Sequence, residues 1–299
     1  MVHSAPAVTL PGTRPLSLAA SGGVRLQACA ADGLSPGLLL AHGFGQTSQA
    51  WLGTQRRLAE SGRASLAWDL RGHGQSGRNP ADLPYRGEQF VDDVVLAAAA
   101  LGPGPVLVGA SMGGLTGLMA QARDRVFSAL VLVDITPRWE ASGVERILGF
   151  MTAHPDGFES FEHAAEEIAA YLPHRRQRKS PAQLAHLLKP REDGRLGWHW
   201  DPRLLAEFIP STGDLQGAIE DACRGLDVPV LLVSGGRSDL VSDQTVGHFL
   251  ELAPHAHHVR LPDATHMVAG DDNDAFTDTL LEFLSTLAAP HAATHGESS

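Results

Sequence analysis

Hydrophobic residues in this chain fall into short unbroken runs, each of which ends at glycine or at a charged residue. Longer segments with helical spacing separate the runs. Short, solid apolar runs are typical of parallel strands that are buried on both faces. The pattern therefore predicts an α/β fold with a mostly parallel sheet, whose strands span residues 38–43, 64–70, 105–111, 129–135, 228–236 and 257–263.

The two ends of the chain add an edge and a closing helix to this sheet. Residues 16–31 have the pattern of two short strands joined by the turn Ser-Gly-Gly at 21–23, which predicts an antiparallel edge. Apolar residues share one helical face at 90, 94, 98 and 101, and Gly102 is a stop signal. A second helix with the same spacing is expected over residues 276–287.

Residues 137–224 interrupt the alternation, because no strand-like run occurs there and several helices follow one another. We therefore expect a core made of residues 1–136 and 225–299, with a helical insertion at 137–224. The basic run 174–179 is interpreted as a solvated loop. The insertion is rich in aromatic residues, which form either its own small core or the wall of a substrate pocket against the sheet. The candidate pocket residues are Trp139, Phe150, Trp198 and Trp200.

Composition excludes several classes of function. The 299 residues carry a formal net charge of −11, which disfavours nucleic-acid binding, and 43% of them are hydrophobic. Cys29 and Cys223 lie far apart, which argues against a disulfide framework and a structural zinc site. The first residues do not resemble an export signal, and no window reaches the roughly 18 apolar residues of a membrane helix. We expect a soluble, cytoplasmic protein without a membrane partner.

The strongest chemical signal is the segment Val-Leu-Val-Gly-Ala-Ser-Met-Gly-Gly-Leu at 106–115. Small residues two before and two after Ser111 allow a strand to turn sharply into a helix, which strains the serine backbone and exposes its hydroxyl. The peptide N–H of Met112, at the helix start, is placed to stabilise an oxyanion. The alternative is a glycine-rich turn with an incidental serine. A phosphate-binding loop is excluded because no lysine follows the glycines.

A serine nucleophile needs a base and a carboxylate that orients the base. His266 follows the last predicted strand and precedes the C-terminal helix, so it is expected at the same sheet edge as Ser111. Asp239, just after the strand at 228–236, is the preferred carboxylate. Asp134, at the end of the strand at 129–135, is the competing candidate, since both satisfy the chain order Ser, Asp, His.

The second oxyanion donor is expected in the tight turn His-Gly-Phe-Gly at 42–45. There the peptide N–H of Phe44 can point toward the same space as that of Met112. His42 is interpreted as a histidine that shapes this turn. The histidines near residue 257 lack the spacing of a metal site, so neither a metal nor another cofactor is expected.

With the serine turn, the His-Gly-Phe-Gly loop, a late aspartate and a last histidine in this order, the chain resembles the α/β-hydrolases from about residue 16 to 288. The resemblance implies a mostly parallel eight-stranded sheet with an inserted helical cap. It further implies Ser111 as nucleophile, His266 as base and Asp239 as acid, with Phe44 and Met112 as oxyanion donors. Thr265 departs from the family, which usually has glycine before the final histidine.

The expected activity is hydrolysis of a small carboxylic ester or lactone through an acyl-enzyme at Ser111. Because serine replaces the aspartate found in related epoxide hydrolases and dehalogenases, their chemistry is not expected. Two alternatives use the same triad, for carbon–carbon bond cleavage or for cofactor-free peracid formation. A third is a ligand receptor that keeps the fold but turns over slowly.

Overall fold

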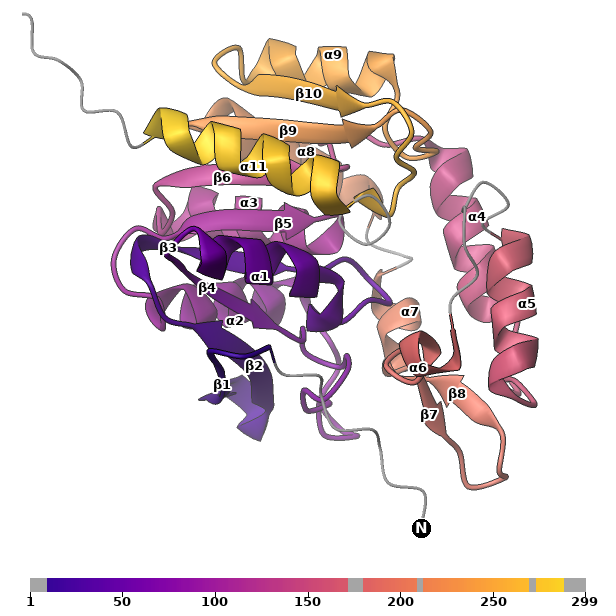
Figure 1. Ribbon diagram of the computed structural model, residues 1–299. Helices are drawn as coiled ribbons and strands as arrows, with labels where there is room; N and C mark the ends of the chain where they lie inside the picture. Colours follow the sequence, from indigo (N-terminus) through magenta and orange to yellow (C-terminus); the bar gives the residue numbers. More distant parts are fainter. Residues whose placement is uncertain (1–9, 172–179, 209–211, 269–272, 288–299) are drawn as a thin grey trace, which may run out of the picture.

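An eight-stranded sheet forms the centre of the molecule in the computed structural model (Figure 1). The structure describes residues 10–171, 180–208, 212–268 and 273–287, so the basic run at 174–179 lies outside it. The strand order is β1-β2-β4-β3-β5-β6-β9-β10. The strands are β1 (Thr13–Ala19), β2 (Arg25–Ala31), β3 (Leu34–Ala41), β4 (Arg63–Trp68), β5 (Val106–Ala110), β6 (Ala129–Val133), β9 (Val230–Gly235) and β10 (His257–Leu261).

The predicted fold class is confirmed. Strands β1 and β2 pair antiparallel to each other, β2 pairs antiparallel to β4, and every other neighbouring pair is parallel. The turn between β1 and β2 is a short 3-10 helix, η1 (Ser21–Gly23), in which Gly22 has a φ of 71°. The inner strands are buried on both faces, which explains their continuous apolar sequence.

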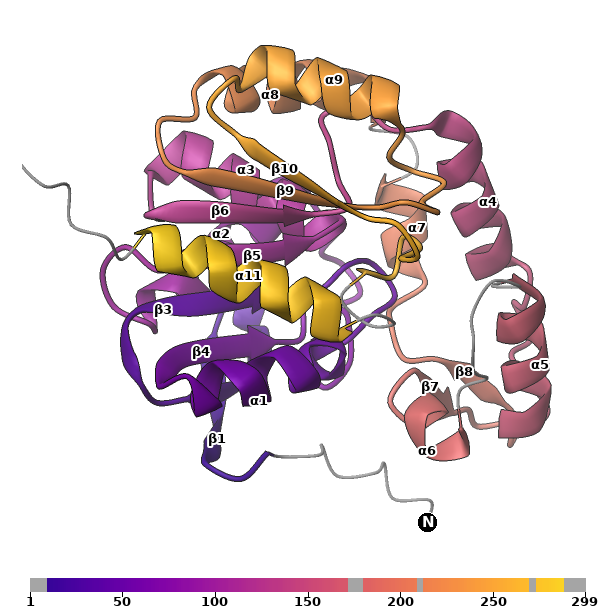
Figure 2. The same cartoon turned by 45° about the horizontal axis from the view of Figure 1, so that its top comes forward.

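Helices cover both faces of the sheet (Figures 1 and 2). On one face lie α1 (Leu52–Glu60), preceded by the 3-10 helix η2 (Ser48–Trp51), and α11 (Asn273–Leu287). The other face carries α2 (Gly87–Ala99), α3 (Met112–Asp124), α8 (Thr212–Arg224) and α9 (Asp243–Leu252). Over the residues that are described, no helix combines the length and the apolar character needed to span a lipid bilayer.

The segment between β6 and β9 lies beyond the carboxyl ends of the parallel strands, which point toward it (Figure 1). Besides helices it contains a small antiparallel sheet that the sequence pattern did not predict, because its strands have three residues each. The last helix of the segment, α8, packs against α3 and α9 of the core. The other elements are α4 (Ala141–Thr152), α5 (Phe161–Tyr171), α6 (Pro181–Leu184), β7 (Leu188–Pro190), β8 (Leu196–Trp198) and α7 (Arg203–Phe208).

Candidate active site

Ser111 occupies the sharp bend between β5 and α3, as the sequence predicts. Its backbone lies in a strained region, with φ 47° and ψ −117°, and its N–H donates to the Val133 carbonyl at 3.1 Å. A Cβ at Gly109 would lie 2.6 Å from Gly114 Cα, and one at Gly113 would lie 2.5 Å from the Ala41 oxygen. Only glycine fits at these two positions, so the bend depends on both.

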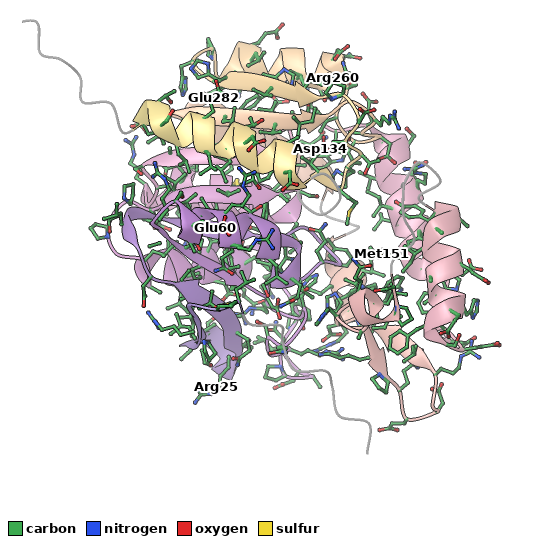
Figure 3. The ribbon with its side chains drawn as sticks, in the orientation of Figure 1. Arg25, Glu60, Asp134, Met151, Arg260 and Glu282 are labelled. Atoms are coloured by element: carbon green, nitrogen blue, oxygen red, sulfur yellow. The ribbon has the colours of Figure 1, made fainter. Side chains whose placement is uncertain are left out.

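The imidazole of His266 is hydrogen-bonded to Asp134. His266 Nδ1 lies 2.6 Å from Asp134 Oδ2, and the carboxylate side chain is completely buried. Since a carboxylate accepts, Nδ1 carries the proton and Nε2 keeps its lone pair, as a general base requires. Asp134, labelled in Figure 3, directly follows β6. Because Val133 pairs with Ala110 of β5, Asp134 and Ser111 follow neighbouring strands at the same end of the sheet.

The structure brings Asp134, and not the preferred carboxylate Asp239, into contact with His266. Asp239 does follow β9, as expected, but its side chain forms an ion pair with Arg146 of α4 rather than a hydrogen bond with His266. The backbone at Asp239 also packs closely on α4, because a Cβ at Gly143 would collide with the Asp239 carbonyl. The aspartate that the sequence ranked second, Asp134, is the one that contacts His266.

Asp134 receives three hydrogen bonds, which stabilise a carboxylate that water does not reach. The Gly235 N–H donates to Oδ1 at 2.7 Å, and the Ser238 hydroxyl donates to Oδ2 at 2.5 Å, beside His266. The Ser238 oxygen itself accepts the N–H groups of Leu240 and Val241. These amides orient the hydroxyl, so that its proton points toward Asp134. Asp134 also has a positive φ of 49°, which directs its side chain out of the strand.

The loop that carries His266 packs against the end of β9. A Cβ at Gly235 would lie 2.6 Å from the Thr265 carbonyl oxygen, so glycine there permits the close approach of the two loops. The Thr265 hydroxyl accepts the N–H of Met267 at 3.2 Å, which accommodates the residue that departs from the family pattern. Among the described residues, no hydrogen bond joins the Ser111 hydroxyl to His266; catalytic hydrogen bonds often tighten only when substrate binds.

The predicted oxyanion loop lies against the serine bend. A Cβ at Gly43 would lie 3.2 Å from Ser111 Cβ, so the loop lies against Ser111. The loop closes by a hydrogen bond from Gln46 N–H to the Gly43 carbonyl at 3.1 Å, with a φ of 74° at Gly45, the pattern of a type II turn. Phe44 and Met112 both pack on the cluster that contains Trp200 and Leu204.

Gln46 contacts two loops near Ser111, which the sequence did not reveal. Its Oε1 accepts the Gly43 N–H at 3.0 Å, and its Nε2 lies 3.2 Å from the sulfur of Met267, next to His266. The side chain thus connects the oxyanion loop with the loop of the base. Its only signal in the sequence is its place three residues after Gly43, where a turn closes.

Three buried imidazoles lie beside the oxyanion loop. The ring centroids of His42 and His73 are 5.3 Å apart, and those of His73 and His199 are 5.8 Å apart. Burial lowers the pKa of His42 to about 4 and that of His73 to about 3. Burial also lowers the pKa of His199 well below its usual value, with His73 contributing. All three rings are therefore neutral at pH 7 and act as hydrogen-bonding groups.

The four candidate pocket residues separate into different environments. Trp200 is buried against Phe44, with ring centroids 5.1 Å apart. Trp198 stacks on Trp200 at 6.4 Å and also contacts Phe158 inside the insertion. Phe150 stacks on Tyr171 at 4.1 Å within the insertion, and Trp139 packs on the main core cluster. Of the four, Trp200 contacts the oxyanion loop.

Met151 is a neighbour of this loop that the sequence analysis did not single out. A Cβ at Gly45 would lie 2.7 Å from Met151 Cε and 3.9 Å from Trp200 Nε1. Met151, labelled in Figure 3, belongs to α4. The insertion therefore contacts the predicted oxyanion loop both from this helix and from Trp200, in the segment after β8. Within the described ranges, no group of three or more His, Cys, Asp and Glu side chains is arranged to hold a metal ion.

Known proteins are similar to this chain in sequence and in fold. Residues 38–279 match the Alpha/beta hydrolase family. The chain is 29% identical to esterase Rv0045c of Mycobacterium tuberculosis over 85% of this chain and 84% of that one. It is 32% identical to a 3-hydroxybutyrate-oligomer hydrolase of Cupriavidus necator over 77% of this chain and 82% of that one.

A solved structure of another hydrolase has the same fold as this chain. The crystal structure of E-2-(acetamidomethylene)succinate hydrolase superposes with a TM-score of 0.77 at 23% identity, over 91% of this chain and all of that one. The family match covers most of the strands and both loops that flank Ser111. This protein belongs to the α/β hydrolase family.

Proposed function

We propose that the protein is a serine hydrolase of small carboxylic esters, in which Asp134 and not Asp239 is the acid of the triad. The observation that carries this proposal is the 2.6 Å hydrogen bond between His266 Nδ1 and Asp134 Oδ2, where Asp134 follows the strand that pairs with the one leading to the strained Ser111. It fixes the tautomer in which Nε2 accepts a proton. The esterase and the oligomer hydrolase among its relatives support the same reaction class.

The mechanism proceeds in two steps. His266 Nε2 removes the proton of Ser111 Oγ, which attacks the ester carbonyl, while the N–H groups of Phe44 and Met112 stabilise the oxyanion. The protonated His266, stabilised by Asp134, donates its proton to the departing alkoxide and an acyl-enzyme remains. His266 then deprotonates a water molecule, which attacks the acyl carbon and releases the acid together with free Ser111.

Side chains around the oxyanion loop favour an apolar substrate group. Phe44 and Met112 pack with Trp200, Leu204 and Met151, all of which are apolar or aromatic. The histidines behind the loop are neutral at pH 7, so they present no cation to an anionic substrate. An ester with an alkyl or aryl group next to its carbonyl would bury that group against Trp200 and Met151.

The test combines covalent labelling with a serine variant. A fluorophosphonate probe followed by peptide mapping should modify Ser111, and Ser111→Ala should abolish labelling. Hydrolysis of p-nitrophenyl esters by Ser111→Ala should fall by about 10⁶-fold in kcat. Ser128→Ala is the matched control, because this exposed serine bonds only to backbone groups near Gly104, and it should behave like the wild-type protein.

Other outcomes would redirect the assignment. Labelling at another residue, or ester hydrolysis by Ser111→Ala at the parent rate, would exclude Ser111 as the nucleophile. A β-diketone substrate and a mixture of acetate with hydrogen peroxide test the two other reactions that the same triad supports. A single burst followed by a stable acyl adduct would indicate a slow-turnover receptor instead of an ester hydrolase.

A further inference from the structure

His199, which lies in the insertion directly after β8, contacts both loops on the oxyanion side of Ser111. The side chain is buried, with 1% of its surface exposed. Its Nδ1 accepts the Gly74 N–H at 2.7 Å, so the ring proton is on Nε2, which donates to the Gly45 carbonyl at 3.1 Å. One imidazole from the insertion thereby connects the turn after β4 with the predicted oxyanion loop.

A continuous set of hydrogen bonds leads from this contact to the Phe44 amide. The Gly45 carbonyl and the Gln46 N–H belong to one peptide group, and that N–H donates to the Gly43 carbonyl at 3.1 Å. The Gly43 carbonyl also accepts the Nδ1 proton of His42 at 2.8 Å. In a planar trans peptide, the Gly43 carbonyl and the Phe44 N–H point in opposite directions. Holding the carbonyl therefore orients the N–H that would stabilise the oxyanion.

His42 and His199 hold different peptide groups of the same loop. The Nε2 atom of His42 accepts the Leu70 N–H at 2.9 Å, which fixes the tautomer that donates to Gly43. His42 belongs to the core, whereas His199 belongs to the insertion. Both rings are buried and neutral, so neither bond is lost to protonation near pH 7.

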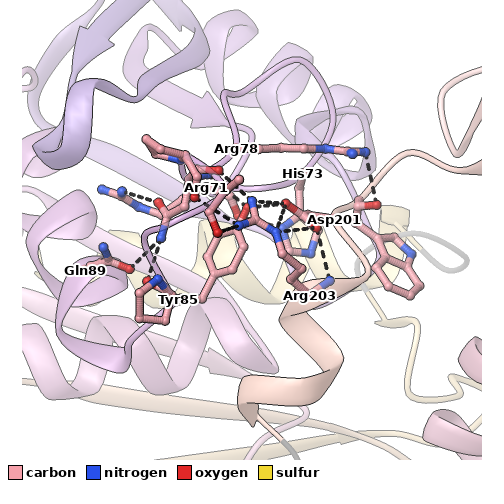
Figure 4. A network of polar contacts seen from close by, with 12 residues as sticks. Arg71, His73, Arg78, Tyr85, Gln89, Asp201 and Arg203 are labelled. Carbon is pink, nitrogen blue, oxygen red and sulfur yellow. Dashed lines mark hydrogen bonds and ion pairs between the residues drawn. The ribbon is translucent and has the colours of Figure 1, made fainter.

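Polar contacts hold the His199 segment against the core (Figure 4). The Tyr85 hydroxyl donates to Asp201 Oδ2 at 2.9 Å, and Arg203 contacts the same carboxylate and the Asn79 carbonyl. The guanidinium of Arg78 donates to the carbonyls of His199 and Trp200, each at 3.3 Å. Lys189 Nζ donates to the Gly74 carbonyl at 2.5 Å. The imidazole therefore has a fixed place from which to hold Gly45.

We propose that His199 is a positioning residue, through which the insertion holds the oxyanion loop in its active conformation. The proposal rests on the proposed function, because it assigns His199 a part in stabilising the oxyanion formed at Ser111. It predicts that the insertion contributes to the chemical step itself, and not only to substrate binding. The decisive bond is the one from His199 Nε2 to the Gly45 carbonyl, rather than the one that Nδ1 accepts from Gly74.

Two substitutions at His199 each keep only one of these two hydrogen bonds, so they test the bond to Gly45 separately from the bond to Gly74. In His199→Gln the amide nitrogen reaches the place of Nε2 and can still donate to Gly45. In His199→Asn the shorter amide lies near the place of Nδ1, so it can serve Gly74 but not Gly45. We expect His199→Asn to lower kcat for p-nitrophenyl esters by about 30-fold, somewhat less than the loss of an oxyanion donor, with KM within about threefold of the parent. His199→Gln should stay within about fivefold in kcat.

The rate of fluorophosphonate labelling at Ser111 provides a second readout, because phosphonylation also needs the oxyanion donors. It should slow in His199→Asn by a factor similar to that in kcat, whereas partial unfolding would lower the labelled amount without changing the rate. His257→Asn, on the exposed face of β10, is the control and should match the parent. Unchanged kcat in His199→Asn, or equal losses in both His199 variants, would overturn the proposal.

If His199→Asn does not fold, Tyr85→Phe tests the same idea through the anchor of the segment. Loss of the hydroxyl bond to Asp201 should lower kcat by about threefold at constant KM, and an unchanged kcat would count against the proposal. If the proposed function itself is wrong, the parent protein will not hydrolyse esters or will not be labelled at Ser111, so this failure can be told apart from a failure of the His199 proposal. Failure of the His199 proposal alone leaves parent activity and Ser111 labelling intact.

Discussion

Hydrogen bonds stabilise different groups on the two sides of Ser111, which are the side of Asp134 and His266 and the side of the loop at 42–45. On the side of the base, Asp134 collects three donors: the Gly235 amide, the Ser238 hydroxyl and the His266 imidazole. On the side of the oxyanion loop, the imidazoles of His42 and His199 donate to backbone carbonyls and accept from backbone amides. The donors on the first side stabilise the Asp134 carboxylate. In the proposed mechanism, the second side orients amide groups toward the negative charge that forms during the reaction.

Burial affects the carboxylate of Asp134 and the imidazoles beside the loop at 42–45 in different ways. A buried carboxylate is tolerated only when it is hydrogen-bonded or paired, which explains why Asp134 gathers its donors. A buried imidazole avoids the same cost by losing its proton, and the lowered pKa values of His42 and His73 show this. Activity should therefore depend on the charge of side chains near Asp134 and His266. Near the predicted oxyanion loop, it should depend on the geometry of the hydrogen bonds, and acid should lower stability there.

The largest effect is expected from the carboxylate itself. Asp134→Asn should lower kcat/KM for p-nitrophenyl esters by about 10⁴-fold, because the amide no longer stabilises the protonated imidazole and favours the wrong tautomer. Asp239→Asn, the matched control at the neighbouring strand end, should remain within about threefold. A large loss of kcat/KM in Asp239→Asn, together with parent-like activity in Asp134→Asn, would make Asp239 the acid of the triad instead.

Acid should destabilise the oxyanion side. In the unfolded chain these imidazoles bind protons below about pH 6.5, whereas folded His42 binds one only near pH 4 and His73 near pH 3. The unfolded state therefore binds more protons between these values, so the free energy of unfolding decreases as the pH falls from about 6.5 toward 4. His42 alone accounts for roughly 3 kcal/mol by pH 4.

Urea unfolding at several pH values measures this dependence. His199→Asn removes one of the buried imidazoles, so its stability should change less between pH 7 and pH 4.5 than that of the parent. The exposed His257→Asn should show the parent's change. Equal pH dependence in all three proteins would mean that burial does not keep the His199 imidazole neutral in the folded state.

Ser238→Ala should produce a moderate effect on the acid–base side. Without the hydroxyl, Asp134 loses one of its donors and a fixed orientation, so we expect kcat to fall by about tenfold. Ser238→Thr keeps the hydroxyl and should recover most of the activity; a kcat of Ser238→Ala equal to that of the parent would exclude this role.

The smallest effect is expected from the ion pair that holds Asp239. Arg146 is 51% exposed and Asp239 is 28% exposed, so solvent screens their attraction and the pair contributes at most about 1 kcal/mol to stability. Arg146 also lies 5.2 Å from the centre of the Tyr171 ring. Arg146→Ala should lower the midpoint of thermal unfolding by a few degrees and leave kcat within twofold. A tenfold loss of kcat would show that Asp239 takes part in catalysis.

The sequence alone determined the sheet, the serine bend and the histidine loop. Buried parallel strands need continuous apolar runs, and a sharp strand-to-helix bend needs small residues at Gly109 and Gly113, so both leave clear local patterns. His266 could be chosen among 15 histidines because it follows the last strand, at the edge where Ser111 lies. Each of these features depends on residues close together in the chain.

Only the tertiary structure decided which carboxylate meets His266 and what the insertion contacts. Asp134 and Asp239 follow the neighbouring strands β6 and β9, and the order of residues along the chain is the same for both. The choice depends on distant partners: Arg146 pairs with Asp239, and Ser238 and Gly235 donate to Asp134. His199 likewise meets Gly45, 154 residues earlier in the chain, through packing that no local pattern records.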